Sequence, residues 1–145
     1  VGAPVAPEVD RWSLVGNDLC RQAVRDGRLA LRSPGLQWRD FIALADVVTL
    51  IGSALTPGGL PGGTYNLGSG TPMTILDLAA LVQDAIEEHT GSRPPLDAPA
   101  ATGVRPDAYH VDIGRLAALG WKPESTVAGA VSETARFCLQ HRGAM

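Results

Sequence analysis

The sequence predicts a small mixed α/β domain built from amphipathic helices and short strands. Two observations carry this prediction. Apolar residues recur at spacings of three and four over several segments, which is the pattern of helices with one buried face. Between these segments lie short apolar runs bounded by glycine and proline, which are typical of short strands and turns. The regular strand–helix alternation of a complete doubly wound domain is missing.

The first half of the chain is predicted to contain two helices and two strands. Residues 8–27 have helical apolar spacing and end at a glycine. Residues 28–32 and 39–44 are predicted as short strands, separated by a Pro-Gly turn. An apolar helix is expected over 45–55, and a glycine-rich loop follows it.

The second half contains the clearest helix signal. A third short strand is predicted over 64–68. Thr74 has an aspartate three residues on, at Asp77, which is the spacing of a capping box. The helix that begins there is expected to end at Gly91. Residues 92–107 are rich in proline and alanine and are predicted as a loop.

The C-terminal region is predicted to add one strand and two helices. The strand is expected over 108–111, and Asp112 is positioned to cap a short helix that ends at Gly120. A final amphipathic helix is predicted over 125–141.

The composition argues against several classes of protein. A net charge of −3 argues against a nucleic-acid-binding protein, which usually has a basic surface. No apolar run approaches the length of a membrane span. Cys20 and Cys138 have no metal-binding or redox spacing, so we predict buried thiols in a reducing compartment. We therefore expect a cytoplasmic protein, and the opening VGAPVAPEVD has the character of the interior of a longer chain.

Other motifs give weaker signals. The three histidines have no ligand spacing with other histidines, cysteines or carboxylates, so we expect no metal site. The glycines in 58–63 follow a predicted helix and precede a predicted strand, which is the wrong order for a dinucleotide-binding loop. The sequence NLGSGTP has some likeness to a nucleophile elbow, but we predict a turn at Ser69 and rank a hydrolase-like site lowest.

Two arginines stand at the edges of predicted strands. Arg39 and Asp40 open the strand in SPGLQWRDFIALADVV, although charged side chains are the most costly to bury. Arg105 stands in TGVRPDAYHVD. Guanidinium groups at fixed positions suit bidentate contacts with phosphate. From the residues alone, an anion-binding site and a structural Arg39–Asp40 pair both remain open.

The order of the segments resembles the C-terminal half of the extended short-chain dehydrogenase/reductase family. The matching elements are VGAP, PGLQWRDFIALADVV, TYNLGSGTPMTILDLAALV and RPDAYHVDIGRLAALGWKP, and together they span nearly the whole chain. This family comprises NAD(P)-dependent nucleotide-sugar epimerases, dehydratases and 4-ketoreductases. The resemblance implies that residues 1–145 form the C-terminal, nucleotide-sugar-binding part of such a protein, without its Rossmann half.

The resemblance also implies a set of substrate contacts. Arg39 and Arg105 correspond to the arginines that grip the pyrophosphate in the family. Asp107 corresponds to an aspartate that often contacts the ribose, although its spacing from the arginine is one residue shorter here. Leu31 lies in the strand whose backbone runs along the nucleobase. Asn17 lies in a helix where sugar and nucleotide contacts arise.

Two further residues are candidate ligand contacts, and three aspartates are expected to have structural roles. Trp12 and Ser13 are also candidate contacts by resemblance, and a core position for Trp12 is an equally open alternative. Three aspartates are expected to be structural, as a strand-edge partner and two helix caps: Asp40, Asp46 and Asp112.

The catalytic elements of the family have no counterpart in these residues. There is no Tyr-x-x-x-Lys pair, and Lys122 is the only lysine. The resemblance therefore implies that NAD(P) binds mainly outside this chain and that no catalytic residue lies within it. Dimerisation in the family mostly uses helices of the Rossmann half, so a homodimer is compatible with the resemblance. The alternative function is a non-catalytic nucleotide-binding or interaction module with the same fold.

Overall fold

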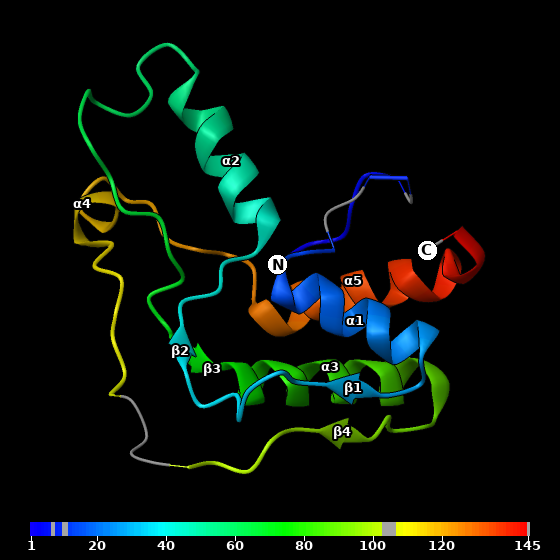
Figure 1. Ribbon diagram of the computed structural model, residues 1–145. Coiled ribbons are helices and arrows are strands. Elements are labelled where there is room, and N and C mark those ends of the chain that lie inside the picture. The colour runs from blue at the N-terminus through cyan, green and yellow to red at the C-terminus, as the bar shows by residue number, and fades with distance from the viewer. Residues whose placement is uncertain (7, 10–11, 103–106, 145) are drawn as a thin grey trace.

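Three helices form the main layer of the molecule. The protein is described by a computed structural model over residues 1–6, 8–9, 12–102 and 107–144. Helices α1 (Val15–Arg25), α3 (Ile75–Thr90) and α5 (Val127–Gln140) pack against one another, as Figure 1 shows. A short 3-10 turn, η1 (Arg142–Ala144), follows α5. Each long helix turns an apolar face inward, and the three faces together exclude water from one core.

Both cysteines lie in this core. Cys20 and Cys138 are buried free thiols, which confirms the predicted burial. Burial raises the pKa of Cys138 to about 11, and it also raises the pKa of Cys20. Both thiols are therefore protonated near neutral pH, and they pack as small apolar side chains.

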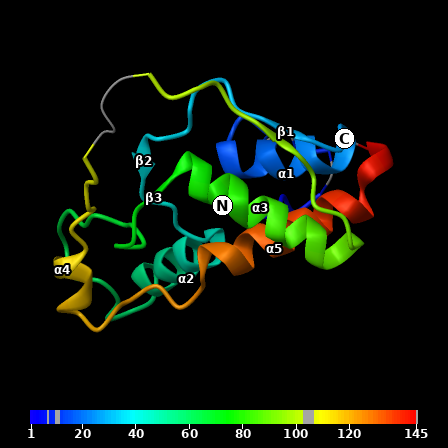
Figure 2. The same cartoon turned by 90° about the horizontal axis from the view of Figure 1, so that it is seen from below.

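Two pairs of short strands border the helix layer. Strand β1 (Leu29–Ala30) pairs in parallel with β4 (Leu96–Asp97), and β2 (Trp38–Arg39) pairs antiparallel with β3 (Met73–Thr74). Over the described ranges these are the only sheets. Figure 2 shows α3 and α5 running next to each other, with the β1–β4 pair bordering the layer. The predicted mixed α/β class is confirmed.

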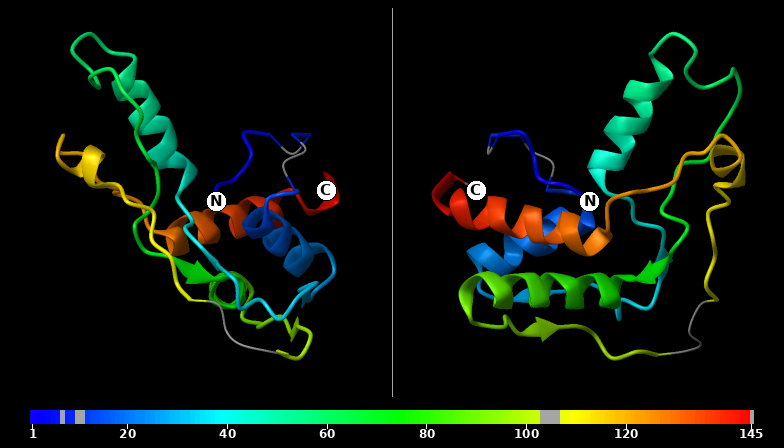
Figure 3. Two further views of the ribbon diagram at one scale, coloured as in Figure 1. Left: turned by 60° about the vertical axis from the view of Figure 1, so that its left-hand side comes forward. Right: turned by 180° about the vertical axis from the view of Figure 1, so that it is seen from behind.

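Helix α2 (Leu44–Ala54) stands apart from this layer. Figure 3 shows it projecting from the body, near the segment that carries α4 (Gly114–Ala117). Four large apolar side chains remain exposed along it at spacings of four, three and four, and we call them the apolar face of α2: Leu44, Val48, Ile51 and Leu55. None of the helices in the described ranges combines the length and the hydropathy needed to cross a bilayer.

The capping signals at both ends of α3 are confirmed. Thr74 Oγ1 accepts a hydrogen bond from the backbone N–H of Asp77, and an Asp77 carboxylate oxygen accepts the backbone N–H of Thr74 in return. At the other end Gly91 adopts the left-handed conformation, with φ of 73°. Both signals act within one turn of the helix, so the sequence alone could locate them.

Two predicted strands are wrong: segments 64–68 and 108–111 contain no strand. The carbonyl oxygen of Thr64 accepts a hydrogen bond from Arg115, and Asn66 donates to the carbonyl oxygen of Asp112. These side-chain contacts join segment 64–68 to the start of α4 without a ladder of backbone hydrogen bonds.

Other boundaries also differ from the prediction. The helix expected over 8–27 begins only at Val15, because the preceding Leu14 has extended backbone angles. The strand expected over 39–44 is reduced to the pair Trp38–Arg39. The loop expected over 92–107 contains strand β4, which forms only because β1 offers it a partner. The helices expected over 45–55 and 125–141 are confirmed, to within two residues at each end, as α2 and α5.

We expect Thr74→Ala to lower the free energy of unfolding by about 1–2 kcal/mol, because it removes the capping contacts of a buried helix terminus. Urea unfolding followed by circular dichroism measures this change. Thr49→Ala, at an exposed position within α2, is the matched control and should have little effect. Equal losses in the two variants would contradict a special role for the capping box.

Candidate functional site

A groove of about 800 Å³ runs between α1 and the segment that leads from β1 to β2. On the α1 side it is lined by residues that include Val15 and Arg21. On the other side it is lined by Leu31, Arg39 and Phe41, among others. The helix supplies a rigid wall, and the chain from β1 to β2 supplies the opposite one.

Arg39 is held at this groove by its backbone rather than by an ion pair. Strand β2 pairs Arg39 with Met73, which fixes the backbone position. The guanidinium donates to the carbonyl oxygen of Trp38 at 2.7 Å and is exposed. Among residues 1–6, 8–9, 12–102 and 107–144, no carboxylate forms a salt bridge with Arg39. The positive charge is therefore available to a ligand.

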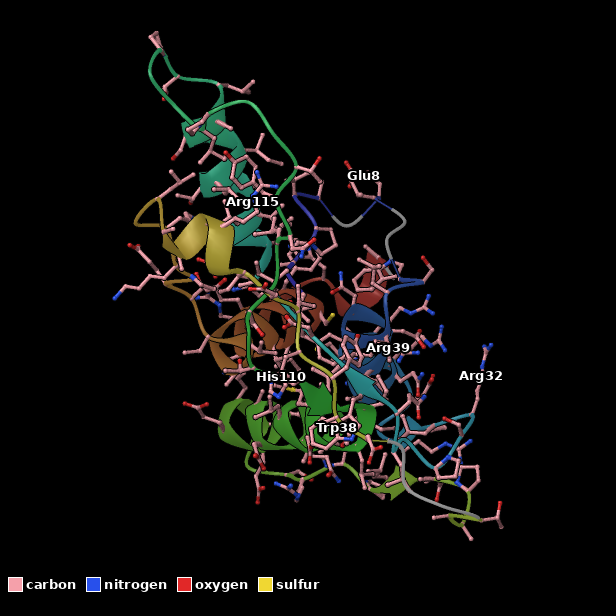
Figure 4. The ribbon with its side chains drawn as sticks, turned by 90° about the vertical axis from the view of Figure 1, so that its left-hand side faces the viewer. Glu8, Arg32, Trp38, Arg39, His110 and Arg115 are labelled. Atoms are coloured by element: carbon pink, nitrogen blue, oxygen red, sulfur yellow. The ribbon has the colours of Figure 1, made fainter. Side chains whose placement is uncertain are left out.

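The groove is positively charged overall. Arg21, Arg32 and Arg39 line it, and Asp18 is the one acidic residue among its described lining. Asp18 pairs with Arg21 at 2.8 Å. Figure 4 shows Arg39 beside α1, with the Arg32 side chain extending outward at the edge of the molecule. Such an arrangement favours an anionic ligand, because the described lining carries three guanidinium groups and one carboxylate.

Asp40 has a structural role next to Arg39. Its two carboxylate oxygens accept the backbone N–H groups of Ser69, at 2.5 Å, and Gly70, at 2.9 Å. Gly70 has a positive φ of 72°, which favours glycine. A Cβ atom on Gly68 would lie 3.1 Å from an Asp40 carboxylate oxygen. The interpretation of Asp40 as the partner of a turn is confirmed, and an Arg39–Asp40 pair is not formed.

The same turn settles the conformation at Ser69. Its hydroxyl oxygen accepts the backbone N–H of Thr71 at 3.0 Å, which closes a local turn. No strand precedes Ser69 and no helix follows it directly, whereas a nucleophile elbow requires both. The predicted turn is confirmed.

The other two aspartates also bind backbone groups. Asp112 accepts the N–H of Gly114, the first residue of α4, at 2.8 Å, although the N-cap residue is Ile113 and the helix ends at Ala117, before the predicted Gly120. Asp46 is buried in α2, but its carboxylate does not cap that helix. It accepts the backbone N–H groups of Glu124 and Ser125 and so joins α2 to the segment before α5.

The structure brings together only part of the predicted contact set. Leu31 lines the groove with Arg39, and its N–H donates to the carbonyl oxygen of Asp97. Asn17 is buried outside the groove lining, where its amide donates to the carbonyl oxygen of Gly2 at 3.0 Å. Asp107 is exposed and is not part of the groove lining. Arg105 lies outside the described residues. Ligand contacts by these residues stay predictions.

The two further candidates, Trp12 and Ser13, both line the groove. Ser13 is exposed and Trp12 is buried, and each contributes to the lining. Trp12 also packs with the helical core. Trp12 is therefore a core residue that also lines the groove.

Sequence reasoning missed the polar wall that α1 contributes. Asp18, Arg21 and Gln22 all line the groove. Their spacing of three and four places them on one side of the helix, and this could have indicated a common polar face. Gln22 extends that wall to β1, because its amide oxygen accepts the N–H of Ala30 at 2.9 Å.

The histidines contribute no comparable site. His110 is exposed. His89 Nε2 lies 3.3 Å from the carbonyl oxygen of Ser132 and 3.1 Å from its hydroxyl. Nε2 donates to the carbonyl oxygen in one tautomer and accepts from the hydroxyl in the other, and either contact ties the end of α3 to α5. Over the described ranges, no three metal-ligating side chains of His, Cys, Asp or Glu gather at one place.

Comparison with known proteins defines the class of fold. No protein-family model and no curated protein sequence matches the chain. Solved structures of nucleotide-sugar epimerases and dehydratases do match it, and they belong to the extended short-chain dehydrogenase/reductase family. The chain therefore has the fold of one part of these enzymes.

Three of the similar structures illustrate the match. UDP-glucose 4-epimerase from Thermotoga maritima, solved with UDP-glucose, matches at a TM-score of 0.71 and 20% identity, over 98% of this chain and 44% of the epimerase. RMD from Pseudomonas aeruginosa, complexed with NADPH, matches at 0.73 and 24%, over 97% and 45%. The dTDP-glucose 4,6-dehydratase from Bacillus anthracis, in complex with NAD, matches at 0.69 and 17%, over 91% and 41%. The chain spans less than half the length of each.

We expect Asp40→Ala to lower the free energy of unfolding by about 2 kcal/mol, because two half-buried N–H groups lose a charged acceptor. Chemical unfolding followed by tryptophan fluorescence measures the change. Asp97→Ala is the matched control, since the Asp97 side chain is exposed and its one contact with described residues is a long ion pair with Arg28, at 3.6 Å. A loss in Asp40→Ala no larger than in the control would contradict the structural role.

Proposed function

We propose that this chain binds the nucleoside diphosphate of a nucleotide sugar, as the substrate-binding part of an NAD(P)-dependent epimerase, dehydratase or 4-ketoreductase. The observation that carries the proposal is Arg39, an exposed arginine that forms no ion pair with any described residue, at a positively charged groove. The fold supports it, since similar structures include an epimerase solved with UDP-glucose. Arg105 is proposed as the second phosphate contact, by resemblance alone.

The groove suits an elongated ligand with a charged centre. Its volume of about 800 Å³ is within the range of small-molecule sites. Arg39 would form charge-assisted hydrogen bonds with the diphosphate, and these would set the position of both ends of the ligand. Leu31 would lie beside the nucleobase. The sugar would extend from the diphosphate toward the part of the enzyme that carries out the reaction.

The residues of this chain do not fit a nicotinamide dinucleotide site. A dinucleotide-binding loop joins a strand to a helix, whereas the glycines of 58–63 follow α2 and lead into an irregular segment. The chain also has no Tyr-x-x-x-Lys pair. We therefore propose that NAD(P) is bound by a separate Rossmann part, and that this chain supplies substrate binding but no reacting group.

The apolar face of α2 is the proposed contact with that part. Leu55 is 81% exposed and Val48 61%, which is costly for large apolar side chains in water. Beside this face lies a hollow of about 590 Å³, bordered by Val1, Leu44 and Glu133. A domain with a complementary apolar surface would cover both features.

The phosphate contact can be tested by titrating the 145-residue chain with UDP in a calorimeter. We expect Arg39→Ala to raise the Kd at least about tenfold, because one charge-assisted contact is lost. Arg25→Ala is the matched control, since Arg25 pairs with Asp26 and is not part of the groove lining. Equal affinity of the Arg39→Ala variant and the unmodified chain would contradict the proposal.

The α2 contact can be tested by binding of a fluorescent apolar dye and by light scattering. We expect the 145-residue chain to be monomeric and to bind the dye, and the double variant Val48→Gln/Ile51→Gln to bind much less, with an unchanged unfolding midpoint. Leu119→Gln removes one isolated exposed leucine and serves as the control. A stable dimer that the double variant dissociates would assign the face to a second copy instead.

A further inference from the structure

The α1 wall of the groove carries a fixed arginine next to an aromatic ring. Arg21 lines the groove, and its Nη2 donates to a carboxylate oxygen of Asp18 at 2.8 Å. Its guanidinium carbon lies 5.7 Å from the centre of the Trp12 ring. We propose that Arg21 is a specificity-determining residue that donates hydrogen bonds to a carbonyl oxygen of the nucleobase. This inference rests on the proposed function.

A chain of hydrogen bonds holds Arg21 in place before any ligand arrives. One oxygen of Asp18 accepts from Arg21, and the other accepts from Gln22 Nε2 at 2.7 Å. The amide oxygen of Gln22 in turn accepts the backbone N–H of Ala30 in β1. Both oxygens of the carboxylate are thus engaged, and the wall is tied to the strand opposite. A guanidinium oriented in this way loses little freedom when it binds.

The same contacts determine which hydrogen-bonding groups Arg21 and Asp18 present to a ligand. A guanidinium has five N–H donors and no acceptor. For Arg21 the Nε–H is buried without a partner among the described residues, and Nη2 donates to Asp18. Because Asp18 is already bound on both oxygens, the pair offers donors to a ligand. Uracil has two carbonyl oxygens as acceptors, whereas adenine has no carbonyl oxygen, accepts only at ring nitrogens and carries an amino donor.

The position of Arg21 matches the nucleobase rather than the diphosphate. Val15 and Arg21 both line the groove and lie six residues apart on α1, which is about 9 Å along the helix axis. In Figure 1 strand β1 runs below the C-terminal part of α1, whereas β2 lies beyond its N-terminal end. The bond between Gln22 and Ala30 places the Arg21 wall at the β1 end. A ligand with its diphosphate at Arg39, on β2, therefore reaches Arg21 with its base.

The test compares UDP with ADP, which share the diphosphate and differ in the base. Calorimetric titration of the 145-residue chain should give a lower Kd for UDP than for ADP. Arg21→Met keeps an apolar stem against Trp12 and removes the donors. We expect it to weaken UDP binding about tenfold and to leave ADP binding nearly unchanged, since one charge-assisted hydrogen bond to the base is lost. Arg25→Met, on the same helix but outside the groove lining, is the matched control.

Arg21→Lys keeps the positive charge and loses the planar arrangement of donors, so we expect it also to reduce the preference for UDP over ADP. If circular dichroism shows that Arg21→Met does not fold, Arg21→Lys replaces it in the test. Equal weakening of UDP and ADP would make Arg21 a phosphate contact and overturn the inference. No change in either Kd would overturn it as well, and in both cases binding that still depends on Arg39 would leave the proposed function standing. Absence of binding by either nucleotide would instead contradict the proposed function itself, and this inference with it.

Discussion

The carboxylate of Asp40 is the contact on which the geometry of the groove depends. It joins the chain after β2 to the turn at Ser69 and Gly70, while β2 itself pairs with β3. The strand that carries Arg39 is thus held at two points. A half-buried carboxylate is stable only when donors satisfy it, and two backbone N–H groups do so here. Asp40 therefore does not neutralise its neighbour, and Arg39 keeps its charge for a ligand.

Helix α1 links the core to the groove. Its apolar residues, such as Leu19 and Val24, pack against α3 and α5, so the helix cannot shift without disturbing the core. Its polar residues lie on the groove side and are tied to β1 through Gln22. A wall built on a packed helix is more rigid than one built on loops. The role proposed above for Arg21 depends on this rigidity.

The projecting helix α2 combines a polar anchor at Asp46 with an exposed apolar face. Asp46 anchors it to the segment before α5 by three donor groups, yet its apolar face remains open to water. The chain matches less than half the length of the similar solved structures. An exposed apolar face of this kind is a feature that a second domain would cover. It agrees with the proposal that this chain binds substrate and that a separate part binds the cofactor.

The sequence by itself determined the features that depend on residues within one helical turn. The capping box of Thr74 and Asp77, the left-handed end at Gly91 and the helix periodicities were all predictable for this reason. The place of Arg39 at a strand edge was predicted from the Pro-Gly turn and the apolar run around it, and a structural role for Asp40 was expected as well. Only the tertiary structure decided the strand pairs, such as Leu29 with Leu96, because they join residues far apart in the chain. It also decided that Asp18, Arg21 and Gln22 line one groove with Arg39, since α1 lies beside the segment from β1 to β2 only when the helical core packs.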